Sequence, residues 1–173
     1  LTFAAAVFFL LVTPGPGVLS LAGVGSGFGA IAGRRYLWGL CLGSNLVMLA
    51  VVSGLAALIL ADPRIRLLLF AASTAYLLYL AARIAFAGAK IAFIERAEAP
   101  GLRGGILLQI INPKAYAVGT AVFTGFNFLP DSASAEVLTK FLILNAIWLP
   151  IHFGWLGAGM TLRRMALSER TQR

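Results

Sequence analysis

Three long uncharged runs constrain this chain more than any other feature of its sequence. Leu1–Gly33, Tyr36–Ala61 and Phe141–Leu162 contain no Asp, Glu, Lys or Arg, and the whole chain is 60% hydrophobic and only 12% charged. About 20 apolar residues in a helix cross the roughly 30 Å hydrocarbon core of a bilayer, and each run is long enough to do so. A soluble fold would need polar residues on its exposed faces. The runs therefore predict an integral membrane protein whose solvent is lipid.

The uncharged runs, bounded by Arg, Lys, Gly or Pro, divide the chain into predicted membrane spans. We expect helices because backbone polar groups in lipid must be satisfied within the segment, and because the short alternating pattern of barrel strands is missing. The predicted fold class is therefore all-α integral membrane, a helical bundle. The expected spans are about residues 1–27, 37–61, 67–87, 104–128 and 137–162.

The distribution of Lys and Arg predicts the orientation, because short loops rich in these residues tend to stay in the cytoplasm. The loops on one side contain Arg64, Arg66 and Lys140, and the other side carries many more basic residues. We therefore expect the N-terminus outside, and the connections between spans 1 and 2 and between spans 3 and 4 inside. The residues on the expected cytoplasmic side are Arg34, Arg35, Arg83, Lys90, Arg96, Arg103, Arg163, Arg164, Arg170 and Arg173.

The connection over about residues 88–103 is the only sizeable one between predicted spans. It separates a first half, residues 1–87, from a second half, residues 104–173, and we expect it to act as a hinge between them. Its segment Lys90–Ala99 is expected to form either a short interfacial amphipathic helix or a solvated loop.

The motif Thr13-Pro14-Gly15-Pro16-Gly17 interrupts the first span. A proline lacks the backbone N–H and removes an intrahelical hydrogen bond, so we expect the helix to break here. The glycines supply backbone freedom. Thr13 is expected to cap a new half-helix whose first turn contains Pro16. The free N–H groups that follow the break are expected to line a cavity.

The motif Asn112-Pro113-Lys114 predicts a second broken helix in the fourth span. Asn112 is a favourable N-cap and Pro113 fits the first helical position, which leaves the carbonyl of Gln109 without its helical partner. At ~1.5 Å per residue, Lys114 lies about 15 Å past Gly104 and therefore near the middle of the membrane.

The two interrupted spans are expected to run in opposite directions, which predicts a 3+3 inverted repeat. Matched broken helices of this kind mark the substrate site of secondary transporters, where positive half-helix N-termini face an anionic group. Lys114 adds to this prediction, because a cation at a helix centre costs about 2.5–3.5 kcal/mol on insertion scales. No Asp or Glu lies in a predicted span, so the expected partner of Lys114 is a substrate carboxylate. The alternative is a lysine that snorkels or binds backbone carbonyls.

Two further polar residues lie deep in the predicted spans. His152 is the only histidine and either carries a proton for coupling or hydrogen-bonds between helices. Asn45 either touches the ligand or packs between helices, and Gly39 with Gly43 forms a GxxxG pattern typical of close helix packing. The expected substrate-binding residues are Thr13, Pro14, Gly15, Pro16, Gly17, Asn45, Asn112, Pro113 and Lys114.

Several function classes are disfavoured by the composition. The net charge of +8 comes from basic residues scattered between apolar runs, not gathered with aromatic residues as in nucleic-acid-binding proteins. Cys41 is the only cysteine, so we expect neither a disulfide nor thiol-redox chemistry. No nucleophile–base pair or metal-ligand set predicts an enzyme, a metal or a cofactor. A secondary transporter of small carboxylate solutes is expected, and a membrane scaffold or assembly subunit is the alternative.

With its two proline motifs, the sequence resembles the LysE/RhtB family of bacterial amino-acid exporters over nearly the whole chain. The resemblance implies a multi-pass exporter of the cytoplasmic membrane that carries amino acids or related metabolites and is coupled to protons. It also implies a substrate path built from both broken helices, and it leaves a homo-oligomer open. The motifs that carry it are Thr13-Pro14-Gly15-Pro16, Gly29 to Gly43 with Gly33-Arg34-Arg35, Ala75-Tyr76-Leu77-Leu78-Tyr79-Leu80 and Asn112-Pro113-Lys114-Ala115.

The chain departs from the family pattern at three places. Asn45 stands where many members have an acidic residue, which puts proton coupling through that position in doubt. Thr124-Gly125-Phe126 replaces a Pro-Gln-Phe sequence, which alters either substrate choice or only a loop. The family implies a sixth helix, whereas the sequence given stops at Arg173 on a basic, polar segment. We therefore expect five spans of six and a fragment of the complete repeat.

Overall fold

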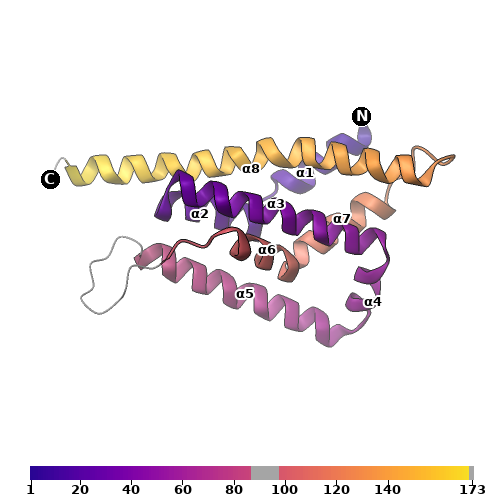
Figure 1. Ribbon diagram of the computed structural model, residues 1–173, viewed down its shortest axis with the longest axis horizontal. Helices are drawn as coiled ribbons and strands as arrows, with labels where there is room; N and C mark the ends of the chain where they lie inside the picture. The colour runs from indigo at the N-terminus through magenta and orange to yellow at the C-terminus, as the bar shows by residue number, and fades with distance from the viewer. Residues whose placement is uncertain (87–97, 172–173) are drawn as a thin grey trace.

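A computed structural model describes residues 1–86 and 98–171, and within these residues every regular element is a helix (Figure 1). The predicted all-α membrane class is confirmed. Residues 90–97 of the predicted Lys90–Ala99 helix or loop, and with them most of the expected hinge, fall outside the described residues. The helices are α1 (Thr2–Val12), α2 (Pro16–Phe28), α3 (Ala30–Val52), α4 (Leu55–Ala61), α5 (Pro63–Phe86), α6 (Leu102–Ile111), α7 (Pro113–Thr124) and α8 (Ala133–Thr171).

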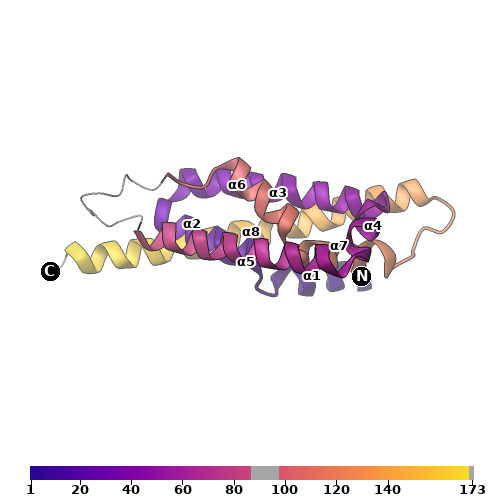
Figure 2. The same ribbon diagram turned by 90° about the horizontal axis from the view of Figure 1, so that it is seen from below.

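The described helices provide between three and five membrane crossings. Helices α3, α5 and α8 are each long and apolar enough to span a bilayer. Helix α1 bends by 53° into α2, and α6 bends by 68° into α7, so each bent pair supplies one further span if it crosses as a unit. The two bent pairs run in opposite directions along the long axis of the bundle (Figures 1 and 2). With both pairs counted, the crossings match the five predicted spans.

The junction between the first two spans is shorter than predicted. The chain turns at Gly29, whose φ of 83° lies in the left-handed region that glycine adopts without strain. Helix α3 begins directly afterwards, so Arg34 and Arg35 lie in its first turns and not in a loop. Both side chains are exposed, and long basic side chains can extend from a helix end to the membrane surface. The same helix ends at Val52, well before the predicted boundary at residue 61.

Helix α8 extends beyond the predicted fifth span at both ends. It continues to Thr171 through the segment that we expected to be a polar tail, and Pro150 lies inside it without ending it. Arg163 explains part of this extension, because its Nη1 atom donates to the carbonyl of Gly27 at 3.1 Å. A cation beside the carbonyl end of a helix, here α2, is electrostatically favourable.

Close backbone packing joins α3 to α6, as the GxxxG pattern predicted. A Cβ atom on Gly39 would lie 2.1 Å from the carbonyl oxygen of Leu102, and one on Gly105 would lie 2.4 Å from the carbonyl oxygen of Tyr36. Gly43 faces the backbone of Ile106 in the same way. Small residues allow membrane helices to approach this closely, which brings α6 and its break into the centre of the bundle.

Large apolar side chains cover the outside of the bundle. On α5 the side chains of Leu67, Leu68 and Leu78 are each about two-thirds exposed. The buried core lies between α2, α3, α6 and α8, around residues such as Leu21 and Leu40. Exposed leucine on this scale is costly in water and favourable in hydrocarbon, so the outer surface agrees with a lipid environment.

Candidate functional site

The first helix break is made by Thr13, Pro14 and Gly15. Helix α1 ends at Val12, and Gly15 is the N-cap of α2 with Pro16 at its first position. The hydroxyl of Thr13 donates backwards to the carbonyl of Phe9 at 2.7 Å, so the predicted capping of α2 by Thr13 is wrong. A threonine hydroxyl can donate to the carbonyl four residues earlier, and Thr13 forms this bond instead of capping α2.

The second break follows the predicted chemistry more closely. The side-chain oxygen of Asn112 accepts the backbone N–H of Lys114 at 3.1 Å, with Pro113 at the first helical position, so the predicted N-cap is confirmed. The carbonyl of Gln109 accepts the N–H of Asn112 at 3.2 Å, so our expectation of an unpaired carbonyl there is wrong. The hydroxyl of Tyr116 satisfies the carbonyl of Ile110 at 2.8 Å. The carbonyls of Gln109 and Ile110 therefore find hydrogen-bond donors among residues at or near the break.

Lys114 brings the two breaks together although they lie far apart in the sequence. Its Nζ atom donates to the carbonyl of Thr13, the C-cap residue of α1. Its stem lies across Gly15, where an added Cβ atom would be 2.6 Å from Cδ of Lys114. Glycine at this position therefore makes room for the lysine. In the structure Lys114 binds a backbone carbonyl, as the alternative interpretation described.

A cavity of ≈ 50 Å³ lies where the breaks meet. Its lining comes from six helices and both breaks, and among the expected site residues it contains Thr13, Gly15, Gly17, Asn112, Lys114 and His152. The other lining residues are Leu10, Leu11, Val18, Ser44, Met48, Gln109, Ala115, Val118, Leu144 and Trp148. The cavity thus has mostly aliphatic walls with polar groups gathered around the breaks.

A chain of buried side-chain hydrogen bonds connects α3 to the second break. Nε2 of Gln109 donates to the hydroxyl of Ser44 at 2.6 Å, and Nδ2 of Asn112 donates to Oε1 of Gln109 at 2.9 Å. Neither Ser44 nor Gln109 was among the expected site residues. The sequence feature that could have indicated them is a polar residue within an apolar span. Gln109 also lies one helical turn before the Asn112 cap.

His152 reaches the cavity from α8 and is only 3% exposed. Its Nδ1 atom lies 2.8 Å from the carbonyl of Trp148, and its ring stacks on the Trp148 indole with the ring centroids 3.4 Å apart. Both contacts fix the orientation of the imidazole within α8. The ring is therefore held in place before any ligand arrives.

Four expected binding residues do not line this cavity: Pro14, Pro16, Pro113 and Asn45. The prolines shape the breaks from outside. Asn45 exchanges two hydrogen bonds with Asn145 of α8, at 3.0 and 2.9 Å, and also donates to the carbonyl of Cys41. This is the contact between helices that the alternative interpretation of Asn45 described, and it places Asn45 outside the cavity lining.

The Asn45–Asn145 pair is expected to contribute to stability and not to solute binding. Replacing either residue by Leu removes both bonds, so a double-mutant cycle should give a coupling free energy of about 0.6 kcal/mol, and at most about 1.7 kcal/mol, as found between membrane helices. Unfolding of the purified variants in mixed micelles measures it. A stable Asn45→Leu variant that has lost ligand binding would contradict this assignment and return Asn45 to the site.

Two curated proteins are similar to the chain over most of its length. A leucine efflux protein of Enterobacter sp. (strain 638) is 28% identical over 150 residues, which cover 83% of this chain and 69% of that protein. This similarity supports the LysE/RhtB resemblance of the sequence. An uncharacterized membrane protein of Pseudomonas aeruginosa is 29% identical over 155 residues, which cover 84% of this chain and 70% of that protein. No protein-family model and no solved structure matches the chain.

The LysE/RhtB resemblance agrees with the physical features of the chain. The similar regions span most of the sequence, and the apolar helices are sufficient for several crossings. Together they make the chain a multi-pass membrane protein. Two of the four motifs that carried the resemblance, at residues 13–16 and 112–115, lie at the breaks that enclose the cavity.

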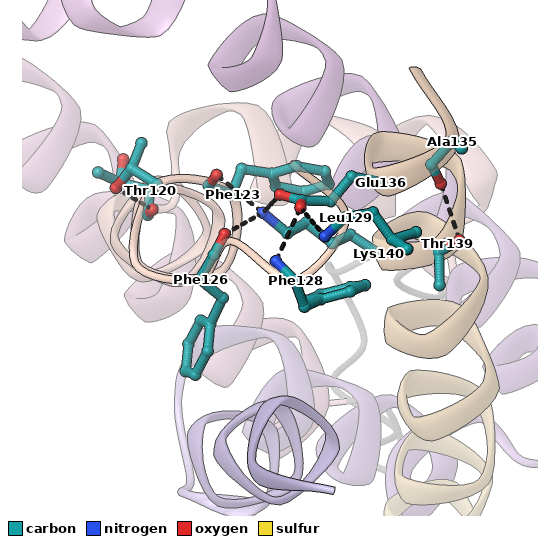
Figure 3. A network of polar contacts seen from close by, with 10 residues as sticks. Thr120, Phe123, Phe126, Phe128, Leu129, Ala135, Glu136, Thr139 and Lys140 are labelled. Atoms are coloured by element: carbon teal, nitrogen blue, oxygen red, sulfur yellow. Dashed lines mark hydrogen bonds and ion pairs between the residues drawn. The ribbon is translucent and has the colours of Figure 1, made fainter. Parts of the chain in front are cut away.

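A second polar cluster lies where α7 leads into α8 (Figure 3). Nζ of Lys140 lies 2.7 Å from Oε1 of Glu136, one turn earlier on α8. It also donates to the carbonyls of Phe123 at 3.2 Å and Phe126 at 2.5 Å, at the end of α7. Lys140 is 2% exposed, so this buried cation is neutralised and hydrogen-bonded within the protein.

Glu136 completes this cluster by holding the loop. Its Oε2 atom accepts the backbone N–H groups of Phe128 at 2.8 Å and Leu129 at 2.7 Å. Phe3 of α1 packs against Phe128, with the ring centroids 5.3 Å apart, so the loop that Glu136 fixes also covers the start of α1. The predicted fifth span began just after Glu136 and missed this carboxylate.

The Glu136–Lys140 cluster is expected to stabilise the α7–α8 loop as a charged pair. Glu136→Gln leaves the Lys140 ammonium buried without its counter-charge, whereas the double variant Glu136→Gln/Lys140→Met removes both charges. The single variant should therefore melt at a lower temperature than the double variant in thermal unfolding of detergent-purified protein. Asp131→Asn, which changes an exposed carboxylate of the same loop, should melt like the wild type. Equal melting of Glu136→Gln and Asp131→Asn would contradict the role of the pair.

Proposed function

We propose that this chain is part of a secondary transporter that exports amino acids with apolar side chains across the bacterial cytoplasmic membrane, driven by protons. One observation carries the proposal: both helix breaks meet at one cavity, and a lysine ammonium lies between them. The similarity to a protein named as a leucine efflux protein supports the same class of solute and the same direction.

Lys114 is the proposed partner of the substrate carboxylate. The described residues that line the cavity include Lys114 and no Asp or Glu, so an anion entering the cavity meets a cation and no opposing carboxylate. The first turn of α7 adds the partial positive charge of a helix N-terminus. A substrate carboxylate would replace the Thr13 carbonyl as the acceptor of the Lys114 ammonium, and a charged acceptor forms the stronger hydrogen bond.

The aliphatic walls of the cavity favour an apolar substrate side chain. They are made by residues from α1, α2, α3, α7 and α8, which surround the polar break on several sides. Burying each methylene group there contributes about 0.8 kcal/mol. The walls consist of Leu10, Leu11, Val18, Met48, Val118 and Leu144.

The size of the cavity supports a mechanism in which the protein must open. A volume of ≈ 50 Å³ holds only roughly four water molecules, which is too little for an amino acid. We infer that the described conformation is a closed state of a site that opens to each side in turn. The two bent pairs belong to the proposed halves, residues 1–87 and 104–173, so relative movement of the halves would open the cavity between them.

The remaining assignments follow from this proposal. The N-terminus lies outside, with the basic junctions in the cytoplasm, and the working unit is a carrier and not an enzyme. Thr13, Gly15, Gly17 and Asn112 contribute backbone and capping groups to the substrate path, while Pro14, Pro16 and Pro113 keep the helices broken. The solute is a small molecule, the surroundings are lipid, and two or more copies can associate.

Flux through purified protein tests the proposed function. The chain is reconstituted into vesicles loaded with unlabelled leucine, and uptake of labelled leucine by exchange is measured against empty vesicles and against loaded vesicles with glutamate outside. We expect saturable leucine exchange that excess glutamate does not inhibit, because a second carboxylate finds no partner in the aliphatic walls. A membrane scaffold would give no exchange, and that result would overturn the proposal.

A further inference from the structure

The tautomer of His152 is determined by its hydrogen bond within α8. Nδ1 lies 2.8 Å from the Trp148 carbonyl oxygen, and a carbonyl can only accept. Nδ1 therefore carries the hydrogen of the neutral ring, and the lone pair is on Nε2. Because the ring lines the cavity and its other nitrogen is engaged within α8, Nε2 is the atom that His152 offers to a ligand.

His152 and Lys114 are the two ionisable side chains of the cavity lining. The described residues that face the cavity from α1, α2, α3 and α6 contribute no ionisable group, and those from α7 and α8 contribute only these two. Lys114 can donate to a carboxylate but cannot accept a hydrogen bond. An ammonium group of a bound solute, which needs an acceptor, therefore has Nε2 of His152 as its available side-chain base.

We propose that the substrate ammonium and a transported proton compete for Nε2 of His152. This inference rests on the proposed function and names its coupling site. Lys114 and His152 line the same cavity, so a solute whose carboxylate binds Lys114 meets His152 within the same site. One lone pair cannot bind a proton and accept an ammonium hydrogen at the same time. Binding of the amino acid thus requires release of the proton.

The competition balances as a one-for-one exchange. On the inner side, a neutral zwitterion binds, its carboxylate pairs with Lys114, and the proton on Nε2 leaves to water in the cytoplasm. On the outer side the zwitterion leaves and a proton from outside binds Nε2. Each cycle moves one zwitterion out and one proton in, so one positive charge enters. Export is therefore driven by both the pH gradient and the membrane potential.

Leucine movement driven by a pH gradient across vesicle membranes tests this coupling. The reconstituted chain is assayed for leucine exchange at equal pH and for leucine movement driven by an imposed pH gradient. In the wild type the gradient should drive leucine toward the acidic side. In His152→Gln, the amide oxygen still accepts from the ammonium but carries no proton at these pH values. Leucine exchange should fall about 2- to 10-fold, and the response to the gradient should be lost.

A second probe separates coupling from binding. 4-Methylpentanoate has the carboxylate and side chain of leucine but lacks the ammonium, so it should bind without displacing the proton. Calorimetry in buffers of different ionisation enthalpy should show proton release for leucine and none for 4-methylpentanoate.

The outcomes are distinguishable. A wild-type chain without leucine exchange would overturn the proposed function and this inference with it. Leucine exchange with an unchanged gradient response in His152→Gln, or equal proton release by both compounds, would overturn the competition at His152 and leave the proposed function standing.

Discussion

Lys114→Met is expected to raise the leucine concentration needed for half-maximal exchange by about 10- to 100-fold. The variant removes a hydrogen bond to a charged group, which contributes about 1.5–3 kcal/mol, and each 1.4 kcal/mol is tenfold in affinity. Lys114→Arg keeps the charge, but its larger head has to fit across Gly15, so it should restore only part of the loss. Leucine exchange in vesicles at several concentrations measures the effect.

The fold should tolerate this change, which makes the result interpretable. Removing a cation from the middle of a membrane helix gains about 2.5–3.5 kcal/mol on insertion scales, and the Thr13 carbonyl loses one partner at a cost of about 1–3 kcal/mol. The melting temperature should therefore stay near that of the wild type. Arg64→Met, which removes an exposed cation at the start of α5, is the matched control and should exchange leucine normally. Wild-type exchange by Lys114→Met would overturn the carboxylate assignment.

Gly39→Val is expected to prevent stable folding of the bundle. Its Cβ atom would lie 2.1 Å from the carbonyl oxygen of Leu102, and the neighbouring atoms are also backbone, so no side chain can rotate away. Overpacking of even a well-adapted core costs about 1–3 kcal/mol, and here α6 as a whole must move away from α3. We expect little monodisperse protein after purification in detergent, and Gly39→Ala should melt measurably below the wild type.

Gly154→Ala is the control for this packing prediction. Gly154 also lies inside a long helix, but nothing surrounds the position of its missing Cβ within 4 Å. Alanine in a helix is favoured over glycine by about 1 kcal/mol, so this variant should be at least as stable as the wild type. Equal melting of Gly39→Ala and Gly154→Ala would contradict the close approach of α3 and α6.

The breaks could be predicted because their causes are local. Pro14, Pro16 and Pro113 remove hydrogen bonds from their own helices. The Asn112 side chain caps α7 by accepting the N–H of the residue two positions later. Charge-free length in the same way predicted which segments form the helices that are long and apolar enough to span a membrane. The boundaries were less accurate, because Gly29 turns the chain alone and α8 continues beyond the predicted end at residue 162 to Thr171.

The pairings across the bundle could not be predicted in this way. Asn45 pairs with Asn145, and Gln109 binds Ser44, through contacts between residues about 100 and 65 positions apart. Such partners depend on how the helices rotate against each other, which the close approach of Gly39 and Gly105 helps to fix. The hydropathy pattern of a span in lipid gives little information about that rotation, because outer and inner faces are both apolar.

The bond between Lys114 and the Thr13 carbonyl has a kinetic consequence for the empty carrier. In a carrier whose substrate-binding cation had no partner in the closed state, that cation would be buried unpaired each time the protein returned without solute. This burial has a desolvation cost. Here the Thr13 carbonyl accepts from the Lys114 ammonium, and in the proposed carrier it would take the place of the solute when none is bound. The proposed carrier would therefore pass through its closed form without a bound solute, which net export requires and obligate exchange does not.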